Sequence, residues 1–347
     1  MSVSVQLDND ELELQAYFRA EDMTDGLPII VPTRDRLERF IAHSGFAMHR
    51  GFVIGGIPPL NAPVTIEDVA VVCLMAGARP QDLGVVLAAI EAMLDPAFTL
   101  PRVQATTNPC APVLFINGPV VRELGIGSSN HAMGPGRHPN GAIGRSIRLA
   151  LRNLGGATDE VDHSSLGQPA KYTCCLGEAE DRSPWEPYHV SRGFRPEQSV
   201  VTVAGIENIV NVVTTTGRHI EMAAPFIYQF GRLMQCIGTN IFDSNGSPVI
   251  VITPGQARRL AEEGYDRKRL QAELFDAAQI PLDVMKYGNF PVCKWSVRNG
   301  KILPCQGADD IRIFVAGGDE ALHSVCMNSF TAVIACSREV WTPQRLQ

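Results

Sequence analysis

The residues best suited to chemistry lie near the middle of the chain, in a glycine-rich loop. The segment Gly134–Arg145, GPGRHPNGAIGR, leads into a predicted helix that continues over Ser146–Leu154 and stops at two glycines. The start of a helix presents free N–H groups that attract anions, and Arg137 and Arg145 would add paired donors for a carboxylate or phosphate. We therefore predict an anion site here. The alternative is a tight turn that needs glycine and leaves both arginines in solvent.

Polar residues around this loop favour a binding role. Asn130 and Asn140 are predicted to contact the substrate, and His131 and His138 lie beside them in the sequence. The loop matches neither a P-loop nor the GxGxxG dinucleotide fingerprint, so the pattern does not name the ligand.

Two adjacent cysteines, Cys174 and Cys175, follow the loop and its helix. A catalytic thiolate needs a nearby cation to lower its pKa, and Lys171, which we also predict to bind substrate, could supply that charge. His163 or His189 could do the same. In an extended segment the two thiols point to opposite faces, so at most one lines a site. The alternative for both is a buried core cysteine.

Proton transfer has several candidates. Glu178 follows the cysteine pair, and His189 ends the proline-framed aromatic loop SPWEPYHV, where it could form an acid–base pair with Glu186. A structural lid is the alternative for that loop. His323 follows a strand that ends in Gly-Gly, where α/β sheets often meet ligands. Further candidates are Arg218 with His219 and Lys286 with Tyr287.

A polar segment before a predicted strand adds two binding residues. Thr106 and Thr107 lie in QATTNPC, which leads into the apolar run Pro112–Gly118. This run is typical of a buried parallel strand, with function expected at its carboxyl end. We therefore predict that both threonines help to bind the substrate.

Metal-ligand spacing is poor throughout the chain. No CxxC, HxxxH or HExxH pattern occurs, and GxSxG is absent as well. We therefore predict no metal ligands, disfavour a serine hydrolase of the strand–elbow–helix kind, and leave the cofactor unnamed. A metal-dependent lyase or hydratase would instead need several of the following residues to converge on one ion: His131, His138, Cys175, Glu178 and His323.

The elements that must position these residues alternate between strands and helices, which indicates an α/β fold with mixed sheets flanked by helices. We expect two intimately packed lobes, a helical and anion-loop lobe over 1–160 and an α/β lobe over 161–347. The predicted strands are 29–31, 112–118, 199–205, 248–253 and 311–318. The predicted helices are 34–43, 69–75 after a capping box at Thr65, 80–93, 146–154, 255–264 and 267–278.

Composition excludes several classes of protein. The chain has 347 residues and a net charge of −7, with no clustered basic surface, which argues against a nucleic-acid partner. It has no apolar run of about 18 residues, and its first residues are acidic where a signal peptide is basic, so we expect a cytoplasmic protein without a membrane partner. The nine cysteines form an odd set that we expect to be mostly reduced. The slightly apolar composition favours a homo-oligomer.

Five motifs resemble those of a family of bacterial proteins of similar length: DGLPIIVPT, QATTNPCAPVLFINGP, GPGRHPNGAIGR, GQPAKYTCCLGE and SPWEPYHVSRGF. That family is associated with short proteins that carry a UGSC motif, where U is selenocysteine, and the resemblance implies thiol-linked chemistry. It favours Cys175, because the family pattern has an aromatic residue at position 174 and the cysteine at 175. The family's His-Pro-Gly-Lys is Gln168-Pro169-Ala170-Lys171 here.

The leading hypothesis is an enzyme that acts on a small anionic, carboxylate-bearing substrate by cysteine-assisted hydrolysis or elimination. Cys175 would be the nucleophile, and Glu178 or His189 would move the proton. The alternatives are the metal-dependent lyase or hydratase and a non-catalytic ligand-binding subunit of a thiol-redox complex, whose thiols only pack. The last alternative gains if the cysteine pair and the arginines lie away from any cleft.

Overall fold

The computed structural model describes residues 10–214, 221–235, 246–285 and 297–346. Within these residues the main sheet has seven strands in the order β10-β6-β11-β5-β3-β4, with β12 paired to β5. The sheet is mixed, because β3 runs parallel to β4 and antiparallel to β5. The strands are β3 (Ala111–Asn117), β4 (Cys175–Gly177), β5 (Val200–Val213), β6 (Val249–Ile252), β10 (Arg312–Val315), β11 (His323–Ser329) and β12 (Cys336–Glu339).

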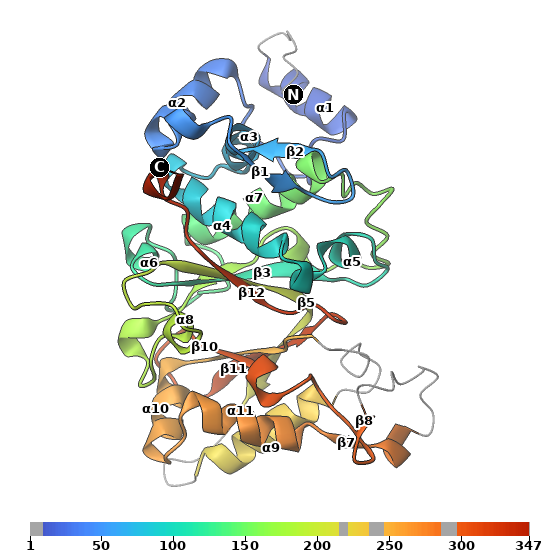
Figure 1. The fold of residues 1–347 in the computed structure, drawn as a ribbon, viewed down its shortest axis with the longest axis vertical. Helices are drawn as coiled ribbons and strands as arrows, with labels where there is room; N and C mark the ends of the chain where they lie inside the picture. The colour runs from blue at the N-terminus through green and yellow to red at the C-terminus, as the bar shows by residue number, and fades with distance from the viewer. Residues whose placement is uncertain (1–9, 215–220, 236–245, 286–296, 347) are drawn as a thin grey trace.

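The sheet curls back on itself and carries helices on both outer faces (Figure 1). The long strand β5 pairs with β3 through its first half and with β11 through its second half, so it joins the two parts of the sheet. One helical layer lies above β3 and β5, and the other lies below β10 and β11. The upper layer contains α3 (Ile66–Ala76), α4 (Leu83–Met93) and α7 (His138–Leu149); the lower layer contains α9 (Ala223–Met234), α10 (Pro254–Glu262) and α11 (Arg267–Ala277).

The strands alternate between an interior and an outer face, because successive side chains of a strand point in opposite directions. Phe115 of β3 and Phe314 of β10 meet inside the curl, with ring centroids 4.1 Å apart and nearly parallel planes. Their neighbours Leu114 and Ile313 point outward into the upper and lower helical layers respectively. The apolar runs therefore bury both faces of the sheet.

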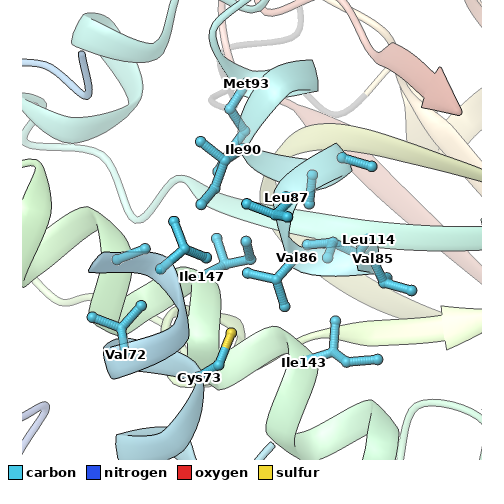
Figure 2. Packing of buried hydrophobic residues seen from close by; sticks show 14 of the residues in the cluster. Val72, Cys73, Val85, Val86, Leu87, Ile90, Met93, Leu114, Ile143 and Ile147 are labelled. Atoms are coloured by element: carbon cyan, nitrogen blue, oxygen red, sulfur yellow. The ribbon is translucent and has the colours of Figure 1, made fainter. Parts of the chain in front are cut away.

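The upper helical layer forms the larger core. At the start of α3, Thr65 and Asp68 form the predicted capping box. The helix α4 is buried along nearly its whole length. Figure 2 shows how its side chains meet those of α3, β3 and α7, and the contact includes Cys73, Leu87, Leu114 and Ile147. This packing fixes α7, which carries part of the candidate site, against the sheet.

Side chains cap the outer edge of β10, which would otherwise present free backbone groups. The Arg267 guanidinium donates to the Ile313 carbonyl at 3.1 Å, and the Gln271 amide donates to the Ile311 carbonyl at 2.6 Å. The backbone N–H of Ala179, just beyond β4, donates to the Val315 carbonyl at 2.7 Å. Helix α11 and the segment after β4 therefore close this edge.

The strand and helix predictions hold at most positions, with three corrections. Residues 29–31 do not form a strand, although Ile29 and Val31 are buried. The N–H of Ile30, which is exposed, donates to the carbonyl of Met75 near the end of α3. Strands β4, β11 and β12 follow weak local patterns and were not predicted. The proposed boundary at residue 160 runs through the sheet, because β3 lies before it and both of its partner strands lie after it.

The remaining elements lie around these layers. Among the described residues, no single helix is long and apolar enough to cross a membrane; one bent pair, 80–93 with 96–104, has the length and composition but turns by 72°. The elements outside the two layers and the main sheet are α1 (Glu11–Ala20), α2 (Arg34–Ser44), α5 (Leu100–Gln104), α6 (Val120–Glu123), α8 (Tyr188–Ser191), the hairpin β1 (Val53–Gly56) and β2 (Pro63–Thr65), and the short strands β7 (Ile280–Pro281), β8 (Val297–Arg298) and β9 (Lys301–Ile302).

Candidate functional site

A cleft opens between α7, the segment that precedes β3, and the loop that leads to β4. The empty space between its walls, open solvent included, is about 390 Å³, of which about 20 Å³ can hold the centre of a water molecule. Its walls are mostly apolar and its charged groups are few, which is the usual make-up of a small-molecule site. The lining residues are Val103, Gln104, Cys110, Pro112, Gly144, Ile147, Arg148, Leu151, Ala157, Asp162, Ala170 and Lys171.

Three charged side chains meet in this cleft. The Lys171 ammonium donates to both oxygens of Asp162, at 2.6 and 2.7 Å, and Arg148 Nη1 donates to the same carboxylate at 3.2 Å. All three side chains are less than one-fifth exposed. These three side chains together carry one positive charge in a partly desolvated place, which favours a small anion. The carboxylate of Glu207, which acts on the nearby Cys110 thiol, reduces that excess.

Gln104, at the end of α5, lines the same cleft and has a buried acceptor without a partner among the described residues. The residue is 3% exposed, and its Nε2 donates to the Pro58 carbonyl. That bond fixes the orientation of the amide, because the opposite orientation would set two oxygens against each other. Its Oε1 is buried and has no hydrogen-bond partner within the described part of the chain. A buried acceptor in this state is unusual in folded proteins.

Cys110 is the thiol that the cleft presents. Burial raises its pKa well above the ordinary value for a thiol, and the charge of Lys171 partly offsets that rise. The nearby carboxylates of Glu207 and Asp162 raise the pKa further, so the thiol is protonated at neutral pH.

The short 3-10 turn Pro169–Lys171 positions the ammonium group. Proline starts the turn, and Gln168 just before it donates through one amide nitrogen to the carbonyls of Pro109 and Ile206. These bonds tie the turn to the segment before β3 and to β5. An amide nitrogen has two protons for this purpose, so Gln168 serves as a structural clamp.

Of the predicted binding residues, Lys171 lies in the cleft, and Thr106 and Thr107 lie between two lining residues, Gln104 and Cys110. Thr106 accepts the Asn108 N–H, and the Thr107 carbonyl accepts from Ser165. The site thus lies at the amino end of β3, whereas the sequence pattern placed function at the carboxyl end of that strand.

Arg145 lies outside the cleft and joins α7 to the segment that contains Asp25 and Pro28. Its guanidinium donates to both oxygens of Asp25 at 2.8 Å and to the Pro28 carbonyl at 2.9 Å. Burial raises the pKa of Asp25, but the bonds and charge of Arg145 outweigh it and hold that pKa below its ordinary value. Two of the motifs noted in the sequence, DGLP and the end of the glycine-rich loop, therefore bind each other.

Apart from Gly144, which lines the cleft, the polar and charged residues of the glycine-rich loop also lie away from it. Asn140 is buried and forms hydrogen bonds with both backbone groups of Gly127 and with the Ala132 carbonyl, so it shapes the loop. Arg137 is exposed and precedes α7 without a side-chain cap. Asn130 is exposed and lies against Gly318. The predicted anion loop is thus exposed at one end of α7, and the cleft lies along the rest of that helix.

The cysteine pair packs beneath α7. Cys175 is 3% exposed and belongs to the upper core, and Gly144 of α7 approaches the backbone of Thr173 and Cys174. Burial raises the pKa of Cys174 to about 12 and that of Cys175 well above the ordinary value. Neither thiol lines the cleft. The loop-helix and the cysteine segment therefore meet in space, and their contact is core packing.

Glu178 and His189 lie near each other, in a second and buried group of charges. Glu178 accepts four hydrogen bonds: from Asn117 at 2.5 Å, from Arg267 at 3.0 Å, and from the backbone of Tyr188 and Val315 at 2.7 and 3.2 Å. Burial raises its pKa, and the charge of Arg267 opposes that rise. All acceptor positions of the carboxylate serve the fold.

His189 completes the buried group through Glu180. Its Nδ1 lies 3.4 Å from Glu180 Oε1, which is ion-pair distance but does not meet hydrogen-bond geometry. Glu180 also accepts from Asn117 and from the Gly118 N–H, both at 2.7 Å. Burial raises the pKa of Glu180, but His189, Asn117 and Gly118 together lower it below the ordinary value.

The aromatic loop before His189 encloses Arg267 rather than a pocket. The guanidinium lies 5.8 Å from the Trp185 ring and 5.9 Å from the Tyr188 ring, and it donates to the Glu186 carbonyl at 2.7 Å. This loop therefore secures the cation that pairs with Glu178.

The remaining candidates lie apart from both groups. His323 is exposed at the start of β11. Within the described residues, no set of three or more His, Cys, Asp or Glu side chains is arranged to hold a metal ion. The pairs Arg218 with His219 and Lys286 with Tyr287 include residues outside the described part of the chain.

Sequence reasoning missed Gln104, Cys110, Arg148 and Asp162. The first two are the end residues of the polar segment QATTNPC, so the predicted Thr106 and Thr107 were two and three positions away from the lining residues. No local sequence pattern marks Asp162 or Arg148, because their pairing depends on how a loop returns to α7.

Comparison with protein-family models, curated proteins and solved structures finds no match to this chain. The resemblance to the bacterial family stays a prediction, and the function has to be argued from the geometry of the site.

Proposed function

We propose that this protein binds a small carboxylate-bearing molecule in the cleft between α7 and the segment before β3. The observation that supports this most is the shared ion pair, in which Lys171 and Arg148 face one carboxylate, Asp162. The ligand carboxylate would balance the second cation, and its apolar part would contact Ile147, Leu151 and their neighbours. Of the functions weighed from the sequence, this corresponds to a ligand-binding protein whose cysteine pair only packs.

The test measures the affinity of short-chain carboxylates by ligand-observed NMR for the unaltered protein and for Lys171→Met. Removing Lys171 leaves Arg148 neutralised by Asp162, so the affinity should fall about tenfold or more, equivalent to about 1.4 kcal/mol. The control is Lys301→Met, which removes an exposed lysine on β9. Equal affinities in the two variants would contradict the proposal.

A second candidate function is cysteine-assisted hydrolysis of the bound molecule, and the position of Cys110 beside Lys171 in the cleft favours it. The Cys110 sulfur would attack an acyl carbon and form a thioester, while its proton leaves with the departing alcohol. Water would then cleave the thioester, which returns the thiol and releases the acid.

Hydrolysis of the 4-nitrophenyl monoester of succinic acid tests this candidate. Cys110→Ala should abolish turnover and Cys175→Ala should retain it. Turnover that survives in Cys110→Ala would exclude a role for that thiol as nucleophile.

A further inference from the structure

We propose that the second half of β5 pairs edge to edge with the same strand of a second copy of this chain. The two strands run antiparallel about a two-fold axis at Asn211, which places Ile209 of one copy opposite Val213 of the other. This pairing does not depend on the function proposed for the cleft.

One edge of β5 is open beyond Ile206. The first residue of β3, Ala111, pairs with Ile206, so β3 borders only the first half of β5. Strand β11 pairs with the second half from the opposite side, since Ile206 pairs with both Ala111 and Ser329. On the side of β3, residues 207–213 therefore have no neighbouring strand within the described chain.

The hydrogen-bond pattern shows which residues face this open edge. The Thr214 N–H donates to the Leu322 carbonyl at 2.9 Å, so these two residues form a hydrogen-bonded pair at the start of β11. Such pairs alternate along an antiparallel ladder, and every second residue before Thr214 also bonds to β11. The residues between them, Ile209, Asn211 and Val213, direct their N–H and C=O groups to the open edge. Within the described part of the chain no hydrogen bond reaches these backbone groups.

The side chains of this strand lack the features that keep a free edge from pairing. Soluble proteins protect exposed edges with charged residues, proline or a covering element. The run 208–214, NIVNVVT, contains neither a charge nor a proline, and Ile209 and Val213 are 36% and 44% exposed. The edge of β10, by contrast, is closed by Arg267 and Gln271. An unprotected edge in the same sheet as a capped one indicates that the unprotected edge has a partner.

The sequence of the strand favours a second copy over an unrelated strand. NIVNVVT has the same residue classes when read from either end, with Asn211 at its centre. A two-fold axis at Asn211 therefore sets apolar side chains opposite each other, Ile209 against Val213, and brings the two Asn211 amides together. Three residues on each copy would exchange about six backbone hydrogen bonds, and the sheet would continue as β11-β5-β5-β11.

Sedimentation velocity over a range of protein concentrations tests this pairing on the full chain. The unaltered protein should be a dimer at micromolar concentration. Asn211→Lys and Asn211→Glu each place two like charges side by side at the axis, so the dissociation constant of either variant alone should rise at least about tenfold. An equal mixture of the two variants should form a dimer again, because the charges across the axis are then opposite.

The matched controls are His323→Lys and His323→Glu, which alter an exposed residue on the neighbouring strand β11 and should leave the dimer unchanged. The mixture of Asn211 variants guards against misfolding, since a restored dimer requires both variants to be folded. A monomeric unaltered protein, or a dimer that survives in both Asn211 variants, would overturn the proposal. Loss of the dimer without recovery in the mixture would also overturn it, because the contact would then not be symmetric at Asn211. A monomer that binds an extended peptide of another protein at this edge would assign the edge to that partner instead.

Discussion

Asp162 and Glu178 are both largely buried carboxylates, and each pairs with a cation, yet their surroundings differ. Asp162 faces two cations, Lys171 and Arg148, and lies in a cleft that reaches solvent. Glu178 is fully buried, accepts from four donors and joins β4, β10 and α11. Charge left over in an open cleft can be used to bind a ligand, whereas a carboxylate with every acceptor position filled holds elements together.

This comparison separates residues that the sequence presents as alike. Glu178, His189 and Arg145 have the residue types of a catalytic site, and the structure pairs each with other parts of the protein. Lys171 has the same kind of pairing but shares its partner with a second cation. Residue type and order along the chain do not distinguish these cases, because the distinction depends on how many partners each group finds.

The largest expected effect comes from breaking the buried group. Arg267→Met should lower the free energy of unfolding by about 3–5 kcal/mol, because it leaves the Glu178 carboxylate buried without its cation. Denaturant titration measures this loss. The matched control is Arg269→Met on the same helix, whose ion pair with Glu273 is exposed, so the variant should leave the stability nearly unchanged. Similar losses in the two variants would remove the contrast between the two carboxylates.

A smaller loss is expected at the pair between α7 and the N-terminal segment. Arg145→Met should lower the free energy of unfolding by about 1–3 kcal/mol, since it leaves the buried side chain of Asp25 without its donors. Carboxylate affinity should stay unchanged, and Arg137→Met, which alters an exposed arginine before the same helix, should change neither quantity. Weaker carboxylate binding in either variant would return the anion site to the glycine-rich loop.

The cysteine pair should give a still smaller effect. Cys175→Ala should cost about 1 kcal/mol of stability, because it leaves a small cavity beneath α7, and it should not change ligand affinity. Thermal unfolding and the NMR titration described above measure the two quantities. A loss of affinity with unchanged stability would assign Cys175 to the site after all.

The last prediction concerns how the free energy of unfolding changes with pH, rather than its value at one pH. The pKa of Glu178 is raised in the folded state, so its contribution to stability is complete below the unfolded value of 4.5 and declines as pH rises above it. The pKa of Glu180 is lowered, so its contribution is complete above 4.5 and declines as pH falls below it. The stability of Glu178→Gln relative to the unaltered protein should therefore rise as pH increases above 4.5. The stability of Glu180→Gln should approach that of the unaltered protein as pH falls below 4.5. Urea titrations from pH 3 to pH 7 measure both, and slopes of the same sign would contradict the assignment.

Local rules account for much of the fold. The capping box at Thr65, the helices of the upper layer and the four long apolar strands all follow from short-range patterns. Strand β4 could not be predicted, because three residues become a strand only when β3 is beside them. Residues 29–31 have strand composition, but their backbone pairs with the end of α3 instead.

The candidate site was less accessible to sequence reasoning than the fold. Lys171 was predicted because it precedes the cysteines. Its actual partner, Asp162, lies 9 positions before it, and Arg148, which pairs with the same carboxylate, lies 23 positions before it. The unpaired oxygen of Gln104 cannot be seen in a sequence at all, since it depends on where the Pro58 carbonyl lies. Convergence of this kind follows from packing, which no local pattern specifies.

The most direct test of the central claim is a crystal structure of the protein with the tightest-binding short carboxylate. The account predicts that the ligand lies in the cleft, with its carboxylate at Lys171 and Arg148. A ligand bound instead at the start of α7, beside Arg137 and His138, would contradict it.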